Sequence, residues 1–271
     1  MLRRIILPLV GLVLMAATTF EDDIVAWRKQ RIERLTADGG WLSLAGLSWL
    51  HEGVNTFGKD EKNEIVVPDG DARAGSFELK GGKVTVRMHG TEKELWPDSL
   101  DFAQAGRSKL YVIKRGEKYG IRVKDPDSEY RRNFHGIENY PAKPEYRVTA
   151  KFVADEKQIP ILNIIGMTEP LKSPGVAVFQ LHGKEYRVRP VFETPDAKEL
   201  FYIFKDETSG KETYGAGRFL YSDLPQNGKV VVDFNKAYNP PCAFTPYATC
   251  PLPPAENKLP VRIEAGEKNY H

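Results

Sequence analysis

Two cysteines are the residues of this sequence whose chemistry is easiest to state. Cys242 and Cys250 are the only cysteines, eight positions apart in a proline-rich stretch. In an oxidising compartment, this spacing predicts a short-loop disulfide, which the chain-entropy model values at roughly 2–3 kcal/mol. Zinc is disfavoured because no close Cys pair and no His-x3–5-His partner is present. A reactive thiolate at Cys242 is the remaining alternative, and it needs a nearby cation such as Arg218 to lower its pKa.

A second group of reactive side chains lies in a predicted hairpin over residues 204–220. Asp206 and Thr208 sit at its turn, and Tyr214 and Arg218 lie four apart in its second strand, 213–220. Alternation along a strand predicts that Tyr214 and Arg218 share one face. Arg218 can then grip a carboxylate or phosphate with two parallel hydrogen bonds. The plainer interpretation is that Asp206 and Thr208 make local turn hydrogen bonds.

Polar residues gather again where the last predicted strand, 229–234, ends. They either tie the following coil to the strand by side-chain hydrogen bonds or form the rim of a ligand site. With the hairpin group they are the ligand-binding candidates of this sequence: Asp206, Thr208, Tyr214, Arg218, Asp233, Asn235, Tyr238, Asn239 and Glu256.

Motifs for common cofactors and for common catalytic machinery are missing from the sequence. The five histidines are scattered, and none lies three to five residues from another, so no metal-binding pair is expected. No Gly-x-Ser-x-Gly elbow, phosphate loop or dinucleotide fingerprint occurs. We therefore predict neither a metal nor an organic cofactor.

The charge balance and the N-terminal segment indicate the class of partner and the cellular location to expect. The 39 Lys and Arg nearly balance 37 Asp and Glu, so no strong positive field favours nucleic acid. Arg3 and Arg4 precede an apolar run over 5–15 and small residues over 16–19. This order is typical of a secretory signal peptide, here 1–19, and the run is shorter than the roughly 20 residues that span a bilayer. We expect an exported, periplasmic or extracellular protein without an integral membrane segment in its mature form.

The hydrophobic pattern predicts a mainly β protein with one N-terminal helix. Residues 20–40 have helical spacing, acidic residues in the first turn and two glycines at the end. From Trp41 onward the period is two, with hairpin signals such as Gly81-Gly82 and His182-Gly183. We expect two packed antiparallel β units of sandwich or barrel type, over 41–125 and 145–271, separated by a proline-containing segment.

Several blocks resemble a family catalogued as domain of unknown function 1684, across nearly the whole mature chain. The blocks are Trp41-Leu42 with Gly46-Leu47 and Trp49-Leu50, then 204–208, 213–220 and 233–244. This resemblance implies no activity. Residues 50–125 are also similar, more locally, to a forkhead-associated β-sandwich, through 55–58, 63–68 and the following Gly-Gly hairpin. Phosphopeptide binding is not implied, because Lys59 stands where that family has arginine and 72–77 lacks its Ser-x-x-His arrangement.

Convergent polar residues without a recognisable catalytic set favour a binding or interaction protein of the cell envelope. The expected partner is a small anionic ligand held in a pocket of the C-terminal half, with Arg218 at its centre. The alternative is a hydrolase-like or thiol-dependent enzyme that uses Cys242 with Asp233 or Tyr214 as proton carriers.

Overall fold

The structure is a computed structural model that describes residues 19–270. It begins with helix α1 (Phe20–Thr36), whose N-cap Thr19 forms a capping box with Asp22. After the helix the chain turns sharply at Gly40, where a Cβ atom would lie 2.5 Å from the carbonyl oxygens of Arg34 and Leu35. Only glycine fits this turn. The predicted signal peptide, apart from Thr19, lies outside the described residues.

The first β unit consists of two sheets packed face to face. One sheet has the order β3-β2-β4-β5-β6 and the other β1-β9-β8-β7. Alternate residues such as Phe57, Phe77, Leu110 and Ile121 are buried between the sheets. The strands are β1 (Leu44–Trp49), β2 (Gly53–Gly58), β3 (Ile65–Val66), β4 (Gly75–Lys80), β5 (Lys83–Met88), β6 (Thr91–Leu95), β7 (Ala103–Ala105), β8 (Ser108–Arg115) and β9 (Lys118–Lys124).

The second β unit follows a short helix, α2 (Glu129–Arg132), and a stretch of coil. A four-stranded sheet of order β12-β11-β10-β15 packs against the two-stranded sheet β13-β14. The coil after β15 completes the unit, because Leu259, Val261 and Ile263 are buried in the same core as Phe204 and Phe234. The strands are β10 (Arg147–Leu162), β11 (Thr168–Leu181), β12 (Lys184–Val188), β13 (Glu199–Phe204), β14 (Arg218–Asp223) and β15 (Lys229–Asp233).

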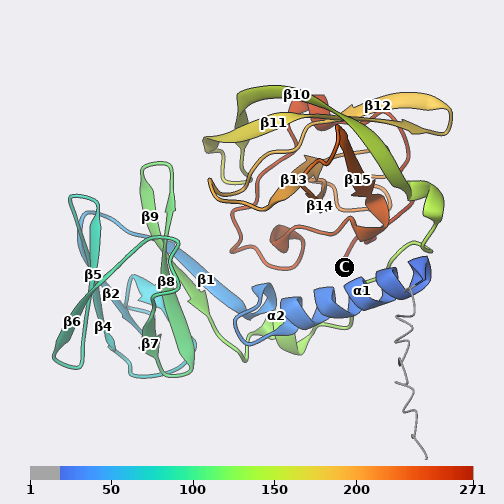
Figure 1. The fold of residues 1–271 in the computed structure, drawn as a ribbon. Coiled ribbons are helices and arrows are strands. Elements are labelled where there is room, and N and C mark those ends of the chain that lie inside the picture. The colour runs from blue at the N-terminus through green and yellow to red at the C-terminus, as the bar shows by residue number, and fades with distance from the viewer. Residues whose placement is uncertain (1–18, 271) are drawn as a thin grey trace, which may run out of the picture.

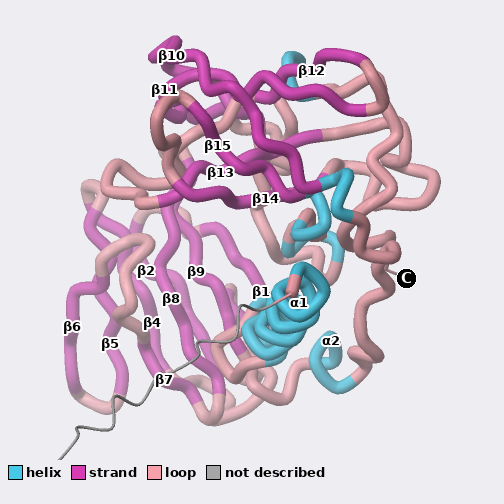
Figure 2. The backbone as a smooth tube through the Cα atoms, turned by 45° about the vertical axis from the view of Figure 1, so that its right-hand side comes forward, coloured by secondary structure: helices cyan, strands magenta, loops and turns pink. Residues whose placement is uncertain are grey.

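Helix α1 lies along the side of the second unit that carries β14 and β15, and the chain then leads through β1 into the first unit (Figure 1). Figure 2 shows the same helix beside β1 and close to α2. The helix buries Ile24, Arg31 and Leu35. The first unit and the second unit therefore meet near the C-terminal end of α1.

The mainly β fold with an N-terminal helix is confirmed. No described helix is long and apolar enough to cross a membrane. One predicted strand is too long, because 213–217 form a loop and β14 starts only at Arg218. The Thr208 carbonyl oxygen accepts the N–H groups of Glu212 and Thr213, which bends this segment away from an extended ladder. Tyr214 and Arg218 are therefore not neighbours on one strand face.

Candidate ligand-binding cavity

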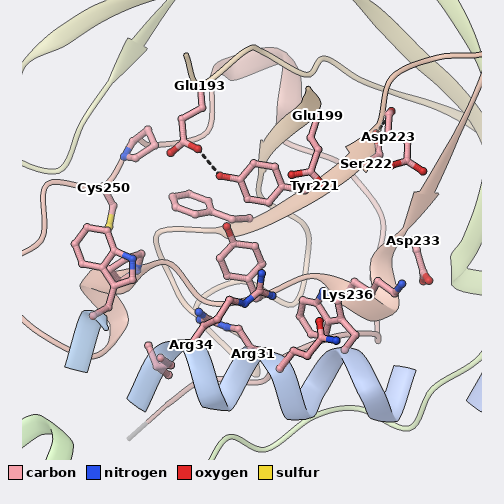
Figure 3. A pocket seen from close by; sticks show the side chains of 18 of the residues that line it. Arg31, Arg34, Glu193, Glu199, Tyr221, Ser222, Asp223, Asp233, Lys236 and Cys250 are labelled. Carbon is pink, nitrogen blue, oxygen red and sulfur yellow. Dashed lines mark hydrogen bonds between the residues drawn. The ribbon is translucent and has the colours of Figure 1, made fainter. Parts of the chain in front are cut away.

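A cavity of about 870 Å³ lies between α1 and the second β unit. The helix contributes Asp23, Trp27, Arg31 and Arg34, which recur every three or four residues and so share one face. In Figure 3, Arg31 and Arg34 point from this face toward side chains of β13 and β14. The helix is therefore one wall of the cavity and the edge of the second unit is the other.

Aromatic rings form the middle of the β wall. Tyr221 stacks on Tyr238 with ring centroids 6.2 Å apart and an interplanar angle of 15°. Phe219 meets Tyr238 edge to face at 5.8 Å, and their backbones pair through two hydrogen bonds of 2.8 and 2.9 Å. The guanidinium carbon of Arg31 lies 4.6 Å from the centre of the Tyr238 ring. These rings offer a flat apolar surface to any bound molecule.

A tyrosine hydroxyl and a carboxylate meet above this aromatic surface. Tyr221 Oη donates to Glu193 Oε2 at 2.5 Å (Figure 3). Burial raises the pKa of Tyr221 strongly, and the neighbouring Tyr238 and Glu193 raise it further. The phenol therefore keeps its proton, and by donating it in a hydrogen bond Tyr221 orients the carboxylate of Glu193.

Ion pairs close the end of the cavity nearest the start of α1. Arg147 bridges Asp23 of the helix and Asp233 at the end of β15, with 2.7 Å between its Nε and the Asp233 carboxylate. Lys236 also pairs with Asp23, at 3.0 Å. Burial alone would raise the pKa of Asp23, but hydrogen bonds from Lys236 and Arg147 outweigh it and leave that pKa below its ordinary value. These charges neutralise one another and fasten the helix to the β unit.

The other charged residues around the cavity differ in whether the protein supplies an ion-pair partner. Arg31 is occupied by Glu267 at 2.9 Å and by the Asn239 carbonyl oxygen. Arg34, in contrast, has no ion pair with any described residue and is exposed. Glu199 and Asp223, on the β wall, likewise have no ion pair within the described part of the chain. A ligand can therefore approach an uncommitted cation on one wall and uncommitted carboxylates on the other.

The opposite end of the cavity lies beside the first unit. Its lining residues there include Trp41, Arg115, Thr249 and Cys250. Arg115 Nε donates to Thr249 Oγ1 at 3.1 Å, so an arginine at the end of β8 reaches the coil of the second unit. This end is thus built from both β units.

The two cysteines are free in the structure, which corrects the predicted disulfide. They are close, because the backbone N–H of Cys242 donates to Cys250 Sγ at 3.2 Å. The hydrogen bond from the Cys250 thiol lowers the pKa of Cys242, and the same contact raises the pKa of Cys250. Tyr214 Oη donates to the Cys242 carbonyl oxygen at 3.2 Å, away from the cavity lining.

Of the ligand-binding candidates proposed from sequence, Asp233 and Tyr238 line the cavity. Arg218 does not, because its side chain is 0% exposed and donates to backbone carbonyl oxygens of the C-terminal coil. Asp206 pairs with Arg218 at 3.3 Å and accepts the Ile263 N–H at 2.7 Å. Thr208 donates to Asp206. These three residues fix the tail, and no surface remains on Arg218 for a ligand.

The remaining candidates are also engaged by the protein. Asn235 binds the backbone of Lys143 through both its amide atoms, at 2.9 and 3.0 Å. The buried Asn239 donates its N–H to Glu267 at 2.7 Å. Glu256 pairs with Arg189 at 2.8 Å. Each ties a coil segment to the second unit, as the plainer interpretation of the sequence proposed for such residues.

Sequence reasoning missed the helix wall. Ile32, which has helical spacing with Ile24 and Leu35, is 37% exposed, and the buried face of α1 contains Arg31 instead. An arginine four residues after a tryptophan and three before another arginine was the available signal. Glu193 and Tyr221 gave none, since their encounter depends on how β14 packs. Among residues 19–270 no group of three or more metal-ligating side chains is close enough to hold an ion.

Comparison with known proteins gives a family and a likeness to solved structures. The profile of a family described as "Protein of unknown function (DUF1684)" matches residues 132–268. No curated protein matches the chain. The solution NMR structure of an uncharacterized protein of Haloarcula marismortui is 29% identical over 51% of this chain and 78% of that chain, with a TM-score of 0.43. The segment matched by the family profile contains β10 to β15 and most of the coil that follows them.

Proposed function

Because this chain belongs to DUF1684, a family whose description assigns no activity, we propose its function from the cavity: it binds a small ligand that combines a flat apolar part with an anionic group. The observation that carries the proposal is the pairing of an aromatic wall with Arg34. Phe219, Tyr221 and Tyr238 supply the wall, and Arg34 supplies a cation without an ion pair in the described chain.

The size and lining of the cavity fit this class of ligand. A volume of about 870 Å³ falls within the roughly 300–1,000 Å³ of typical small-molecule pockets. Flat rings pack on stacked tyrosines, and a guanidinium group recognises a carboxylate or phosphate with two parallel hydrogen bonds. Glu199 and Asp223 add hydrogen-bond acceptors on the facing wall for hydroxyl or amine groups of the ligand.

A fluorescent aromatic sulfonate, 8-anilino-1-naphthalenesulfonate, tests this proposal because it joins fused rings to one anionic group. Titration of the native protein is expected to show a saturable site. Arg34→Gln should raise the dissociation constant about tenfold, since one charge-assisted hydrogen bond is lost. Far-ultraviolet circular dichroism of the variant checks that it remains folded.

Lys29→Gln is the matched control, because Lys29 lies on the same helix but does not line the cavity. It removes the same charge and should leave the dissociation constant unchanged. Equal weakening in both variants would reduce the effect to general attraction of the dye by positive charge. A wild-type protein that binds no dye, or an Arg34→Gln variant that binds as tightly as wild type, would contradict the proposal.

The enzyme alternative receives less support from the same geometry. Cys242 and Tyr214 do not line the cavity, and Asp233 is held by Arg147 and by Asn235. A general base or nucleophile must reach its substrate, and neither Cys242 nor Tyr214 does so there. Ligand binding without chemistry is therefore the function we favour.

Export remains part of the proposal. Arg3, Arg4 and the apolar run over 5–15 support cleavage after the small residues that follow. N-terminal sequencing of the protein recovered from the medium or periplasm tests this, and an intact Met1 in a cytoplasmic fraction would contradict it.

A further inference from the structure

Arg122, in the middle of β9, is a buried cation for which the protein supplies no carboxylate. The residue is 8% exposed, and no described side chain forms a salt bridge with it. Its Nε has no hydrogen-bond partner, and one terminal nitrogen donates to Thr249 Oγ1 at a long 3.5 Å. Its guanidinium carbon also lies 5.0 Å from the centre of the Trp41 ring. A buried charge in such surroundings is costly unless an anion pairs with it.

A second arginine converges on the same point. Arg115 Nε donates to the same hydroxyl oxygen of Thr249, at 3.1 Å. Burial lowers the pKa of Arg122, and the nearby charge of Arg115 lowers it further. Two like charges are therefore directed at one hydroxyl group, and guanidinium groups are the side chains best suited to bind a phosphate or sulfate group.

Two acidic groups of the protein are near enough to compete for this charge. Asp98 pairs with Arg115 at 3.0 Å, and its side chain is 47% exposed, so it reaches only the outer arginine. Cys250 lies next to Thr249, but its thiol holds a proton because the hydrogen bond with Cys242 and burial both raise its pKa. Neither group neutralises Arg122.

The position of this cluster connects it with the cavity. Thr249, Arg115 and Trp41 line the cavity at its end beside the first unit. Arg122 is not itself a lining residue, but one of its terminal nitrogens lies 3.5 Å from the Thr249 hydroxyl oxygen and its guanidinium lies over the Trp41 ring. A group bound at Thr249 is therefore in reach of both guanidinium groups and still continuous with the aromatic part of the cavity.

We propose that this end of the cavity is a subsite for a tetrahedral oxyanion, the phosphate or sulfate group of the ligand, held by Arg115, Arg122 and the hydroxyl of Thr249. The inference rests on the proposed function and deepens it, because it makes the ligand a phosphorylated or sulfated molecule with a flat part. Arg115 already pairs with Asp98 through one terminal nitrogen, so the donors directed at this point are the other terminal nitrogen of Arg115, the guanidinium of Arg122 and the hydroxyl of Thr249. A phosphate or sulfate group offers three free oxygens in a tetrahedral arrangement to donors that approach from different sides.

Calorimetric titration with inorganic phosphate and with phenyl phosphate tests the subsite, at constant ionic strength set with sodium chloride. Wild-type protein should bind both, and phenyl phosphate more tightly because its ring enters the aromatic part. Arg122→Met should weaken phosphate binding about 10- to 100-fold, the loss of one or two charge-assisted hydrogen bonds. Thr249→Val, which keeps the side-chain shape, should weaken it less.

The thermal unfolding midpoint of Arg122→Met separates a binding role from a structural one. Without phosphate the variant should unfold no earlier than wild type, because methionine fills the space of the arginine stem and removes an unpaired charge. Phosphate should then raise the midpoint of wild type more than that of the variant. Arg187→Met, an exposed arginine on β12, is the control and should behave as wild type.

The outcomes distinguish the subsite from the wider proposal. If Arg122→Met leaves the dissociation constant for phosphate unchanged, the subsite is wrong. If Arg34→Gln still weakens dye binding in that case, the proposed function stands. Phosphate binding that depends on Arg122 with no dye binding at all supports the subsite and contradicts the aromatic cavity. A variant that loses stability without phosphate, and whose Cys250 becomes harder to alkylate, would identify the Cys250 thiolate as the partner of Arg122 and overturn the subsite.

Discussion

Arg218 and Arg122 are both buried arginines, but the protein surrounds their guanidinium groups in different ways. The two terminal nitrogens of Arg218 donate to three carbonyl oxygens of the C-terminal coil and to Asp206. The guanidinium of Arg122 meets an aromatic ring and one distant hydroxyl. Burial lowers the pKa of Arg218 as well, yet the charge of Asp206 opposes that effect, and Arg122 has no such carboxylate bound to it.

The difference separates charge used for folding from charge kept for binding. Around Arg218, each carbonyl oxygen belongs to residues 263–267, so the arginine acts as the anchor of a coil that has no strand ladder of its own. The Nε atoms of Arg218 and Arg122 both lack a hydrogen-bond partner, but Arg218 uses both terminal nitrogens, whereas Arg122 makes one long hydrogen bond. Arg34, at the cavity, has no ion pair with a described residue. The number of hydrogen-bond and ion-pair partners, more than burial, therefore indicates which arginine is available to bind a ligand.

Removing the anchor should give the largest effect. Arg218→Met is expected to lower the free energy of unfolding by about 3–5 kcal/mol, because it leaves Asp206 as a buried charge without a partner. Urea unfolding followed by circular dichroism measures this, and a variant too unstable to purify agrees with it. Arg262→Met removes a half-buried arginine of the same coil, whose ion pairs with Glu212 and Glu264 lie near the surface, and should change much less. A stable Arg218→Met protein would remove the distinction drawn between the two arginines.

A smaller effect is expected for the ion pairs that fasten α1. Since the pKa of Asp23 is below its ordinary value, its carboxylate stabilises the fold above about pH 4 and loses this contribution as the pH falls through its lowered pKa. Asp23→Asn should lower the free energy of unfolding at pH 7 by about 0.5–1 kcal/mol, a modest value because the side chain is 38% exposed.

The same variant should unfold like wild type once the pH is low enough to protonate Asp23. Glu21→Gln is the control for general loss of negative charge near the helix start. Glu21 lies two residues before Asp23 in the same first turn and has no ion pair with a described residue. A difference between Asp23→Asn and wild type that stays constant down to pH 2 would show that the carboxylate charge is not what fastens the helix.

The sequence predicted the fold well because hairpins are local. Gly81-Gly82 and His182-Gly183 adopt the left-handed backbone that such turns require, and antiparallel strands flank both. The same reasoning was wrong for 213–217, because the Thr208 carbonyl oxygen accepts the N–H groups of Glu212 and Thr213 in place of a partner strand. Alternating residue types do not reveal such competition.

The site was harder to predict for a physical reason. Dense polar residues near the C-terminus marked Arg218, Asp206 and Asn235 as candidates, but density reflects how many hydrogen bonds a coil without a ladder must find. Arg122 stands alone among apolar and basic residues of β9, with no sequence neighbour to suggest a role. Arg122 stands out only because no carboxylate of the folded protein pairs with it, and the absence of such a pair can be seen only in the packed structure.

The side-chain Nε–H resonances of Arg122 and Arg218 provide the most direct test of the contrast between them. In nitrogen-15 NMR spectra, assigned with the Arg122→Met variant, phosphate titration should shift the Arg122 resonance in a saturable way, with a dissociation constant equal to the calorimetric one. The Arg218 resonance should not move. An unchanged Arg122 resonance at saturating phosphate, or equal shifts for both arginines, would contradict the assignment of Arg122 to ligand binding and Arg218 to the fold.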